Sequence, residues 1–157
     1  MFTFVINSTL QAIMKLRIDN QVLVDEFFQD TRLLGIVAPI KQYQFCWHLN
    51  HVLGFDFRIN NNIEIQLTKK QRNYFFSVYE YAENSGTMHH YLYNNQFDGE
   101  YLLPEFKHLD FLWLIKDDIM QDDDVANLIG SIKAMQPVQL ITEMTNEKIK
   151  NKQHLIF

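Results

Sequence analysis

The sequence predicts an α+β domain with a single, mostly antiparallel sheet of about six strands and two helices packed on one face of the sheet. Residues 41–53 and 122–135 carry apolar residues at helical spacing. Residues 63–68 instead alternate between apolar and polar side chains, the pattern of a half-buried strand. Aromatic and β-branched residues also gather in short segments between turn residues, which favours further strands.

The first half of the chain begins with a strand at residues 31–37, apolar on both faces, which Pro39 ends before the first helix. Gly54 is placed to cap the C-terminus of that helix. Three antiparallel strands should follow, and Glu83-Asn84-Ser85-Gly86 has the composition of a hairpin loop between the last two. We expect these strands at residues 63–68, 74–82 and 88–93.

The second half of the chain should supply a strand at residues 109–115, a helix and a last strand at residues 138–144. The three consecutive aspartates 122–124 complement the positive end of a helix, and Pro137 stops that helix. Because the 109–115 strand is apolar on almost every position, we expect it at the centre of the sheet.

The 157 residues are enough for one domain, which should bury roughly 70% of the surface of the unfolded chain. We assign residues 14–157 to this α+β domain, with a short strand or arm at residues 15–18. Residues 1–13 are expected to be a disordered or non-native N-terminal extension, because Met14 offers a start of its own. No apolar run in the sequence is long enough to cross a bilayer.

The composition disfavours some classes of partner and site. The net charge of −5 opposes attraction to phosphate backbones, which disfavours nucleic-acid binding. The single cysteine, Cys46, excludes an intrachain disulfide and a CxxC-type zinc site, and a reducing cytoplasm is the expected location. We expect Cys46 to behave as a small buried hydrophobe.

No metal or cofactor is predicted. His48 and His51 share one face of the first helix, but two imidazoles without a third ligand are typical of a solvated stripe. Gly-rich phosphate loops and nucleophile-elbow patterns are absent from the sequence.

Residues 103–111 read Leu-Pro-Glu-Phe-Lys-His-Leu-Asp-Phe and lead into the predicted central strand. Pro104 and Glu105 should shape a loop in which Glu105 accepts backbone N–H groups. Asp110 would lie at the rim of an apolar face, where a carboxylate needs a partner. The candidate partners, which could form a polar network that anchors the first helix to the sheet, are Arg32, Tyr43, Trp47 and Asn50.

This segment resembles the signature of the IPExxxVDY family of small bacterial proteins. Leu103, Pro104 and Glu105 fill its first three places, while Leu109, Asp110 and Phe111 fill its last three. Phe111 lacks the hydroxyl of the tyrosine in that pattern, so no role of a phenol is carried over. The resemblance also covers residues 33–36, 47–50 and 155–157. It implies no particular reaction, since the family has no established activity.

Three hypotheses for function follow. The first is a non-catalytic interaction or regulatory module, with a homodimer or another protein as partner, because large aromatic strands and an apolar helix can present a surface without any reactive group. The alternative is a small-ligand binding protein or an enzyme in which Glu105 and Asp110 act as general acid and base. RNA binding on the aromatic strands is a third hypothesis, which the scarcity of nearby positive charge disfavours.

Overall fold

The computed structural model describes residues 2–83, 86–117 and 120–157. Within these residues, six strands form one sheet in the order β10-β1-β9-β6-β5-β2, and every neighbouring pair is antiparallel. The predicted α+β class is therefore confirmed. The strands are β1 (Thr31–Val37), β2 (Arg58–Ile59), β5 (Val78–Ala82), β6 (His89–Asn94), β9 (Phe111–Lys116) and β10 (Leu140–Met144).

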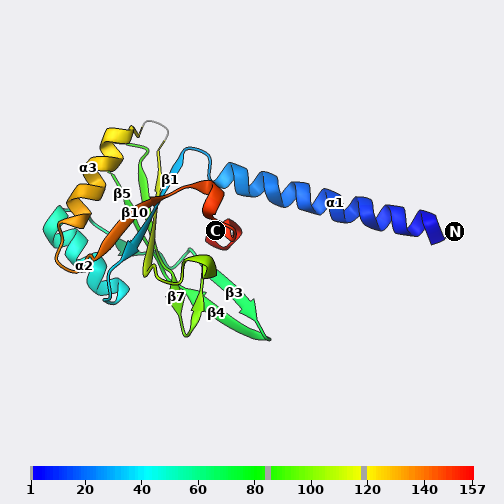
Figure 1. The fold of residues 1–157 in the computed structure, drawn as a ribbon, viewed down its shortest axis with the longest axis horizontal. Coiled ribbons are helices and arrows are strands. Elements are labelled where there is room, and N and C mark those ends of the chain that lie inside the picture. Colours follow the sequence, from blue (N-terminus) through cyan, green and yellow to red (C-terminus); the bar gives the residue numbers. More distant parts are fainter. Residues whose placement is uncertain (1, 84–85, 118–119) are drawn as a thin grey trace.

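Two helices, α2 (Gln42–Leu53) and α3 (Asp122–Lys133), cover one face of this sheet, as predicted (Figure 1). Beneath them lies a core in which the ring of Phe45 stacks on that of Phe111 at 4.8 Å between centroids. Asp124 accepts the backbone N–H of Gln121 at 3.1 Å, so an aspartate does satisfy the start of α3.

The opposite face of the sheet is covered by a hairpin of β3 (Ile65–Lys69) and β4 (Arg72–Phe76), together with the C-terminal segment. A second core forms there, with Tyr93 and Leu155 fully buried. Because β9 contributes side chains to both cores, it is buried on both faces, and its predicted central place in the sheet is confirmed. The remaining short elements are β7 (Gln96–Phe97), β8 (Glu100–Tyr101) and the 3-10 helices η1 (Pro104–Phe106), η2 (Asn146–Lys148) and η3 (Lys152–Leu155).

The continuous strand predicted at residues 74–82 is wrong, because the chain breaks at Ser77. β4 pairs with β3, whereas β5 pairs with β6 in the main sheet, so the three expected strands belong to two sheets. Gln42, at the start of α2, donates its side-chain amide to the carbonyls of Ser77 and Leu92 at 3.1 and 3.0 Å. These bonds satisfy the backbone where the chain changes sheet. In the loop predicted at 83–86, residues 84 and 85 lie outside the described residues.

The predicted first helix is confirmed as α2, and Gly54 caps it in the left-handed conformation with φ 72°. The apolar residues of this helix would allow it to bury a wide arc, but the structure buries only a narrow stripe against the sheet. Tyr43 and Trp47 lie outside this stripe and are 57% and 54% exposed. The fully or nearly buried members of that stripe are Gln42, Phe45, Cys46 and Leu49.

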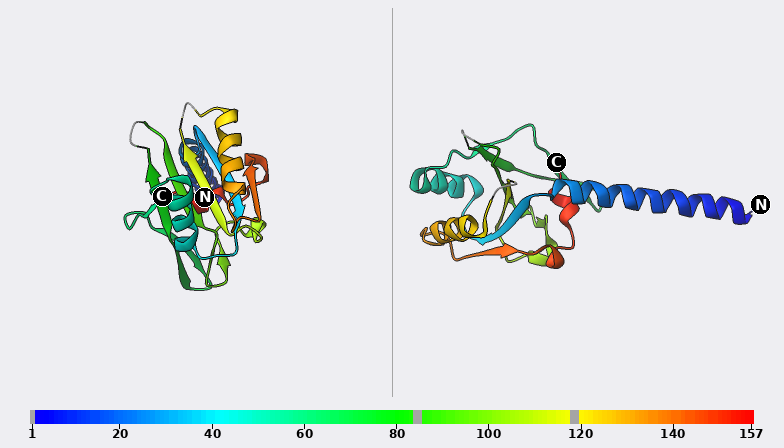
Figure 2. Two further views of the ribbon diagram at one scale, coloured as in Figure 1. Left: turned by 90° about the vertical axis from the view of Figure 1, so that its left-hand side faces the viewer. Right: turned by 90° about the horizontal axis from the view of Figure 1, so that it is seen from above.

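Residues Phe2–Phe27 form a single helix, α1, that stands away from the domain on the side opposite α2 and α3 (Figure 1). Figure 2 shows the same projection from two further directions. The short strand or arm expected at residues 15–18 is therefore wrong, and the proposal that residues 1–13 are an extension stays a prediction. None of the helices in the described residues is long and apolar enough to span a membrane.

Candidate functional site

The 103–111 segment folds as a tight loop between β8 and β9. Leu103, with φ −114° and ψ 88°, lies outside the α-helical region that a following proline disfavours, and Pro104 begins the 3-10 helix η1. Leu102, Leu103 and Leu109 are at most 1% exposed, so they fix both ends of the loop in the second core.

Asp110 is held by backbone groups at the junction of β1 and β9. Its Oδ2 accepts the N–H of Ala38 at 2.8 Å, and its own N–H donates to the carbonyl of Ile36 at 2.8 Å. Burial raises the pKa of Asp110 above its usual value, although the bond from Ala38 acts in the opposite direction. Asp110 thus joins the end of β1 to the start of β9.

Glu105 accepts backbone N–H groups, as predicted, and those of the C-terminal segment join it to a part of the chain outside its own loop. Its Oε1 accepts the N–H groups of Lys150 and Asn151 at 2.9 and 3.0 Å, and its Oε2 accepts the side-chain amide of Asn151 at 2.7 Å. Burial alone would raise the pKa of Glu105, but these hydrogen bonds to the anion outweigh it and lower the pKa. Glu105 therefore ties η1 to the segment before η3.

The centre of this loop is Asn95, which the sequence analysis did not select. It is fully buried, and its Nδ2 donates to the carbonyls of Phe106 and Leu109, both at 2.9 Å. Its Oδ1 accepts the N–H of Leu103 at 2.9 Å. Its backbone N–H donates to the carbonyl of Asp110, and its carbonyl accepts the N–H of Leu102. The side chain and the backbone of one residue therefore organise the whole turn from residue 102 to residue 110.

A close approach between β1 and the loop adds a steric constraint. A Cβ atom built on Gly35 would lie 2.5 Å from Cδ1 of the buried Leu109 and 3.0 Å from Sδ of Met144. Real side chains essentially never approach so closely, so the loop packs here because residue 35 has no side chain.

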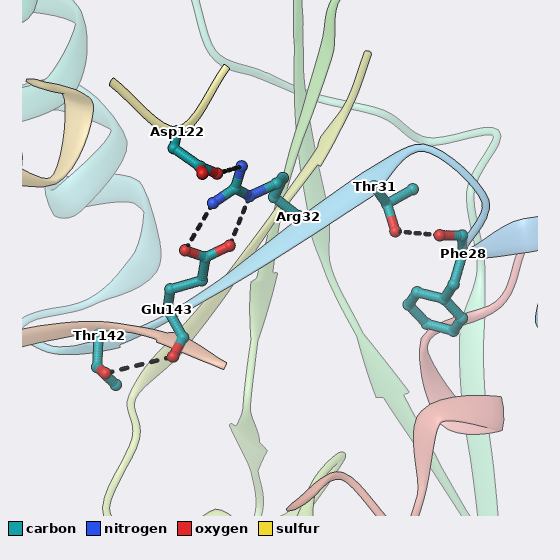
Figure 3. Close-up of polar contacts among 6 residues, drawn as sticks. All are labelled: Phe28, Thr31, Arg32, Asp122, Thr142 and Glu143. Atoms are coloured by element: carbon teal, nitrogen blue, oxygen red, sulfur yellow. Dashed lines mark hydrogen bonds and ion pairs between the residues drawn. The ribbon is translucent and has the colours of Figure 1, made fainter. Parts of the chain in front are cut away.

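The predicted polar network around Asp110 is wrong, because its four members have other partners or other positions. Arg32 forms a bidentate pair with Glu143, at 2.5 and 2.9 Å, and a third bond to Asp122 at 2.7 Å (Figure 3). These bonds, chiefly those to Glu143, hold the pKa of Arg32 above its usual value. Asn50 pairs instead with the backbone N–H and carbonyl of Phe57.

The geometry does not join the two carboxylates in a common cavity. The cavity beside the loop measures about 140 Å³. Neither Glu105 nor Asp110 lines it or any of the four other cavities described. Its lining residues are Phe106, His108, Leu109, Thr142, Glu143, Met144, Thr145 and Lys148. None of these cavities could therefore hold a substrate between Glu105 and Asp110 acting as general acid and base.

The structure also gives no support for a metal site or for a cysteine nucleophile among the described residues. The described residues contain no group of three His, Cys, Asp or Glu side chains able to hold a metal ion. His51 bonds the carbonyl of Trp47 through Nδ1 and stacks on the Trp47 ring. Cys46 is buried, as predicted, and burial raises the pKa of its thiol to about 12, so it is a poor nucleophile.

The aromatic residues on which the RNA-binding hypothesis depends are buried or only partly exposed in the structure. Phe76, Tyr91 and Tyr93 are each at most 9% exposed and lie in the second core, and Tyr79 and Tyr81 are only partly exposed. Bases stack only on exposed rings, so these residues serve packing.

Exchanging each carboxylate for its amide should destabilise the protein at Glu105 but not at Asp110. Glu105→Gln should destabilise the protein at neutral pH, because the ionised form that accepts three hydrogen bonds is lost. Asp110→Asn should leave stability unchanged or raise it, because ionised Asp110 is disfavoured by burial while an amide oxygen can still accept the Ala38 N–H. Urea unfolding of both variants at pH 7 measures this.

Acidification provides the control for these two variants. The raised pKa of Asp110 means that the folded state binds a proton more tightly than the unfolded state. The free energy of unfolding of wild type should therefore rise relative to that of Asp110→Asn as the pH falls. A lowered pKa does the reverse, and the advantage of wild type over Glu105→Gln should shrink in acid. A strong loss of stability in Asp110→Asn at pH 7 would contradict this account.

No family model and no curated protein matches the chain.

Proposed function

We propose that this protein is a non-catalytic interaction module, and that its contact element is α1. One observation carries the proposal. Seven large apolar side chains on α1, in a stretch that the domain does not cover, are each 47% to 67% exposed. Exposed apolar surface of this extent is typical of a site that another molecule covers. The residues are Leu10, Ile13, Met14, Leu16, Ile18, Val22 and Leu23.

Helix energetics support the same conclusion. Every residue from 10 to 23 is exposed, so the domain buries none of these side chains. In proteins, most helical stability comes from packing an apolar face, and isolated helices are only marginally stable in water. A partner that buries some of these apolar side chains would stabilise the helix.

The internal bonds of the 103–111 segment also support a module without catalysis. Asp110 and Glu105 are occupied by backbone and amide groups of the chain itself. We further propose that the chain belongs to the IPExxxVDY family, in which Pro104, Glu105 and Asp110 would have this structural role. The free, buried thiol of Cys46 supports our placement of the protein in a reducing, cytoplasmic compartment of a bacterial cell.

Site-specific photocrosslinking in cells tests the proposed contact. A benzophenone amino acid would be placed at Leu16 or at Ile18, on opposite sides of α1, and at the exposed Glu64 as a control on the domain. We expect a discrete protein adduct from at least one position on α1 and none from Glu64. Absence of an adduct at both α1 positions would reject α1 as the contact element.

A further inference from the structure

We propose that the partner of α1 is a second copy of the same helix, in a parallel two-stranded coiled coil. This inference rests on the proposed function and names the partner. The contact would follow a line of residues, here called the seam, that recur at alternating spacings of four and three. The seam consists of Thr9, Ile13, Leu16, Asn20 and Leu23.

The apolar members of the seam are accessible in the structure. Ile13, Leu16 and Leu23 are 47%, 67% and 57% exposed. α1 leaves the domain on the side away from α2 and α3, so its own domain does not cover these side chains (Figure 2). A second copy related by a two-fold axis along the helix would cover the same residues on both chains.

Asn20 indicates both the number of chains and their alignment. In the heptad pattern it occupies the same type of position as Ile13, one heptad later. A single asparagine at such a position lowers the stability of a coiled coil but fixes its register and the number of its strands. In a parallel pair, the two Asn20 amides meet each other in one layer and can hydrogen-bond across the axis.

The charges beside the seam favour the parallel orientation. Arg17 follows Leu16 on one flank, whereas Asp19 and Glu26 lie on the other flank. In a parallel pair, the flank after the seam of one helix faces the flank before the seam of its partner, so Arg17 faces Ala12, five positions earlier, and meets no like charge. In an antiparallel pair, like flanks face each other, which places the two Arg17 side chains on the same flank. Only the parallel arrangement therefore keeps the two Arg17 side chains on different flanks of the pair.

The contacts at the base of α1 set where the coiled coil ends. The ring of Phe27 packs edge-on against Phe28 and Phe157, at 5.0 and 5.2 Å, and Lys116 Nζ lies 3.9 Å from its centroid. The last turn of α1 thus packs against its own domain. The seam ends at Leu23, beyond which the two domains diverge.

A second ridge on α1 offers a matched control. Leu10, Met14, Ile18 and Val22 follow each other at intervals of four and lie largely on the other side of the helix. Ile18 is 61% exposed, close to the value for Leu16, but it lies about 160° away around the helix axis at 100° per residue. Lysine at either position removes the same kind of side chain from the same helix.

Sedimentation equilibrium of the purified full chain tests the inference. Wild type should be a dimer. Leu16→Lys should weaken the dimer by about a hundredfold or more, since two buried leucines are lost per dimer. Ile18→Lys should dimerise as wild type does. The domain should keep its thermal midpoint in both variants, because neither residue contacts it.

Separate experiments test the orientation of the two helices and the identity of the partner. With Thr9→Cys, oxidation should link the two chains in a parallel pair, whereas an antiparallel pair would keep these residues apart. A monomeric wild type, or a dimer that Ile18→Lys disrupts and Leu16→Lys does not, would overturn the inference. If the purified chain is monomeric but the probe at Leu16 captures a different protein in cells, the interaction function survives and self-pairing fails. If neither occurs, both fail.

Discussion

Replacing Asn95 with alanine should lower the free energy of unfolding by about 3 to 5 kcal/mol, because two buried backbone groups, the N–H of Leu103 and the carbonyl of Leu109, would lose the side-chain partner that satisfies them. The carbonyl of Phe106 would lose one of its two donors and keep the N–H of Leu109. A buried polar group without a partner costs about 1–3 kcal/mol, and the site is too tightly enclosed by leucines for solvent to replace the side chain freely. Urea unfolding of the purified variant measures the loss.

Two further variants make the Asn95 prediction specific. Asn95→Asp keeps the shape but directs a carboxylate oxygen at two carbonyls, so it should be at least as destabilising as alanine. Asn94→Ala, at the half-buried preceding residue, should cost less than about 1 kcal/mol. Equal losses at residues 94 and 95 would show that strand propensity, and not the hydrogen bonds of Asn95, determines the effect.

The sequence pattern predicts the elements well where a strand or helix is buried on one face only or on all sides. β1 has the predicted bounds, and the ends of α2 and β9 differ from prediction by at most two residues. The break at Ser77 could not be predicted, because a strand that changes sheets keeps its aromatic composition. The β3–β4 turn was also hidden, since Lys70 and Gln71 adopt positive φ, 50° and 64°, without the glycine or asparagine that usually marks such a turn.

The candidate site shows the limit of reasoning from residue types. The sequence shows that Asp110 and Glu105 need partners, and it predicts that the Glu105 carboxylate accepts backbone N–H groups. It cannot show that those partners come from Ala38 and from the C-terminal segment, because that depends on how distant loops meet. Asn95 escaped notice because it stands in a turn rich in polar residues, where an asparagine ordinarily serves the local chain.

His90 is a second buried polar residue whose environment only the fold reveals. It is 1% exposed, and its Nδ1 accepts the indole N–H of Trp113 at 3.1 Å. Because an indole nitrogen can only donate, the imidazole proton lies on Nε2, which is 3.6 Å from Oε1 of Glu83. The rings of Phe55, Phe57 and Tyr81 surround the imidazole.

This environment should make stability depend on pH through His90. Burial, and secondarily the neighbouring His89, lower the pKa of His90 from 6.5 to about 4. Between these values the unfolded chain binds a proton that the folded chain does not, so stability is full above pH 6.5 and falls as pH decreases. The contribution of His90 should be a loss of about 2 kcal/mol between pH 7 and pH 5, at 1.36 kcal/mol per pH unit below 6.5.

The difference between wild type and His90→Gln isolates this contribution, because all other titrating groups are shared. Glutamine cannot take up a proton, so the variant should start less stable at pH 7 but lose about 2 kcal/mol less on acidification to pH 5. NMR titration of the His90 ring would give its pKa directly. His89→Gln, on the adjacent strand position that faces the other side of the sheet, should keep most of the wild-type slope, because it removes only the smaller cause of the lowered pKa of His90. If His90→Gln also kept that slope, the buried imidazole would have to be protonated within the folded protein, which requires Glu83 to move into hydrogen-bond distance of Nε2.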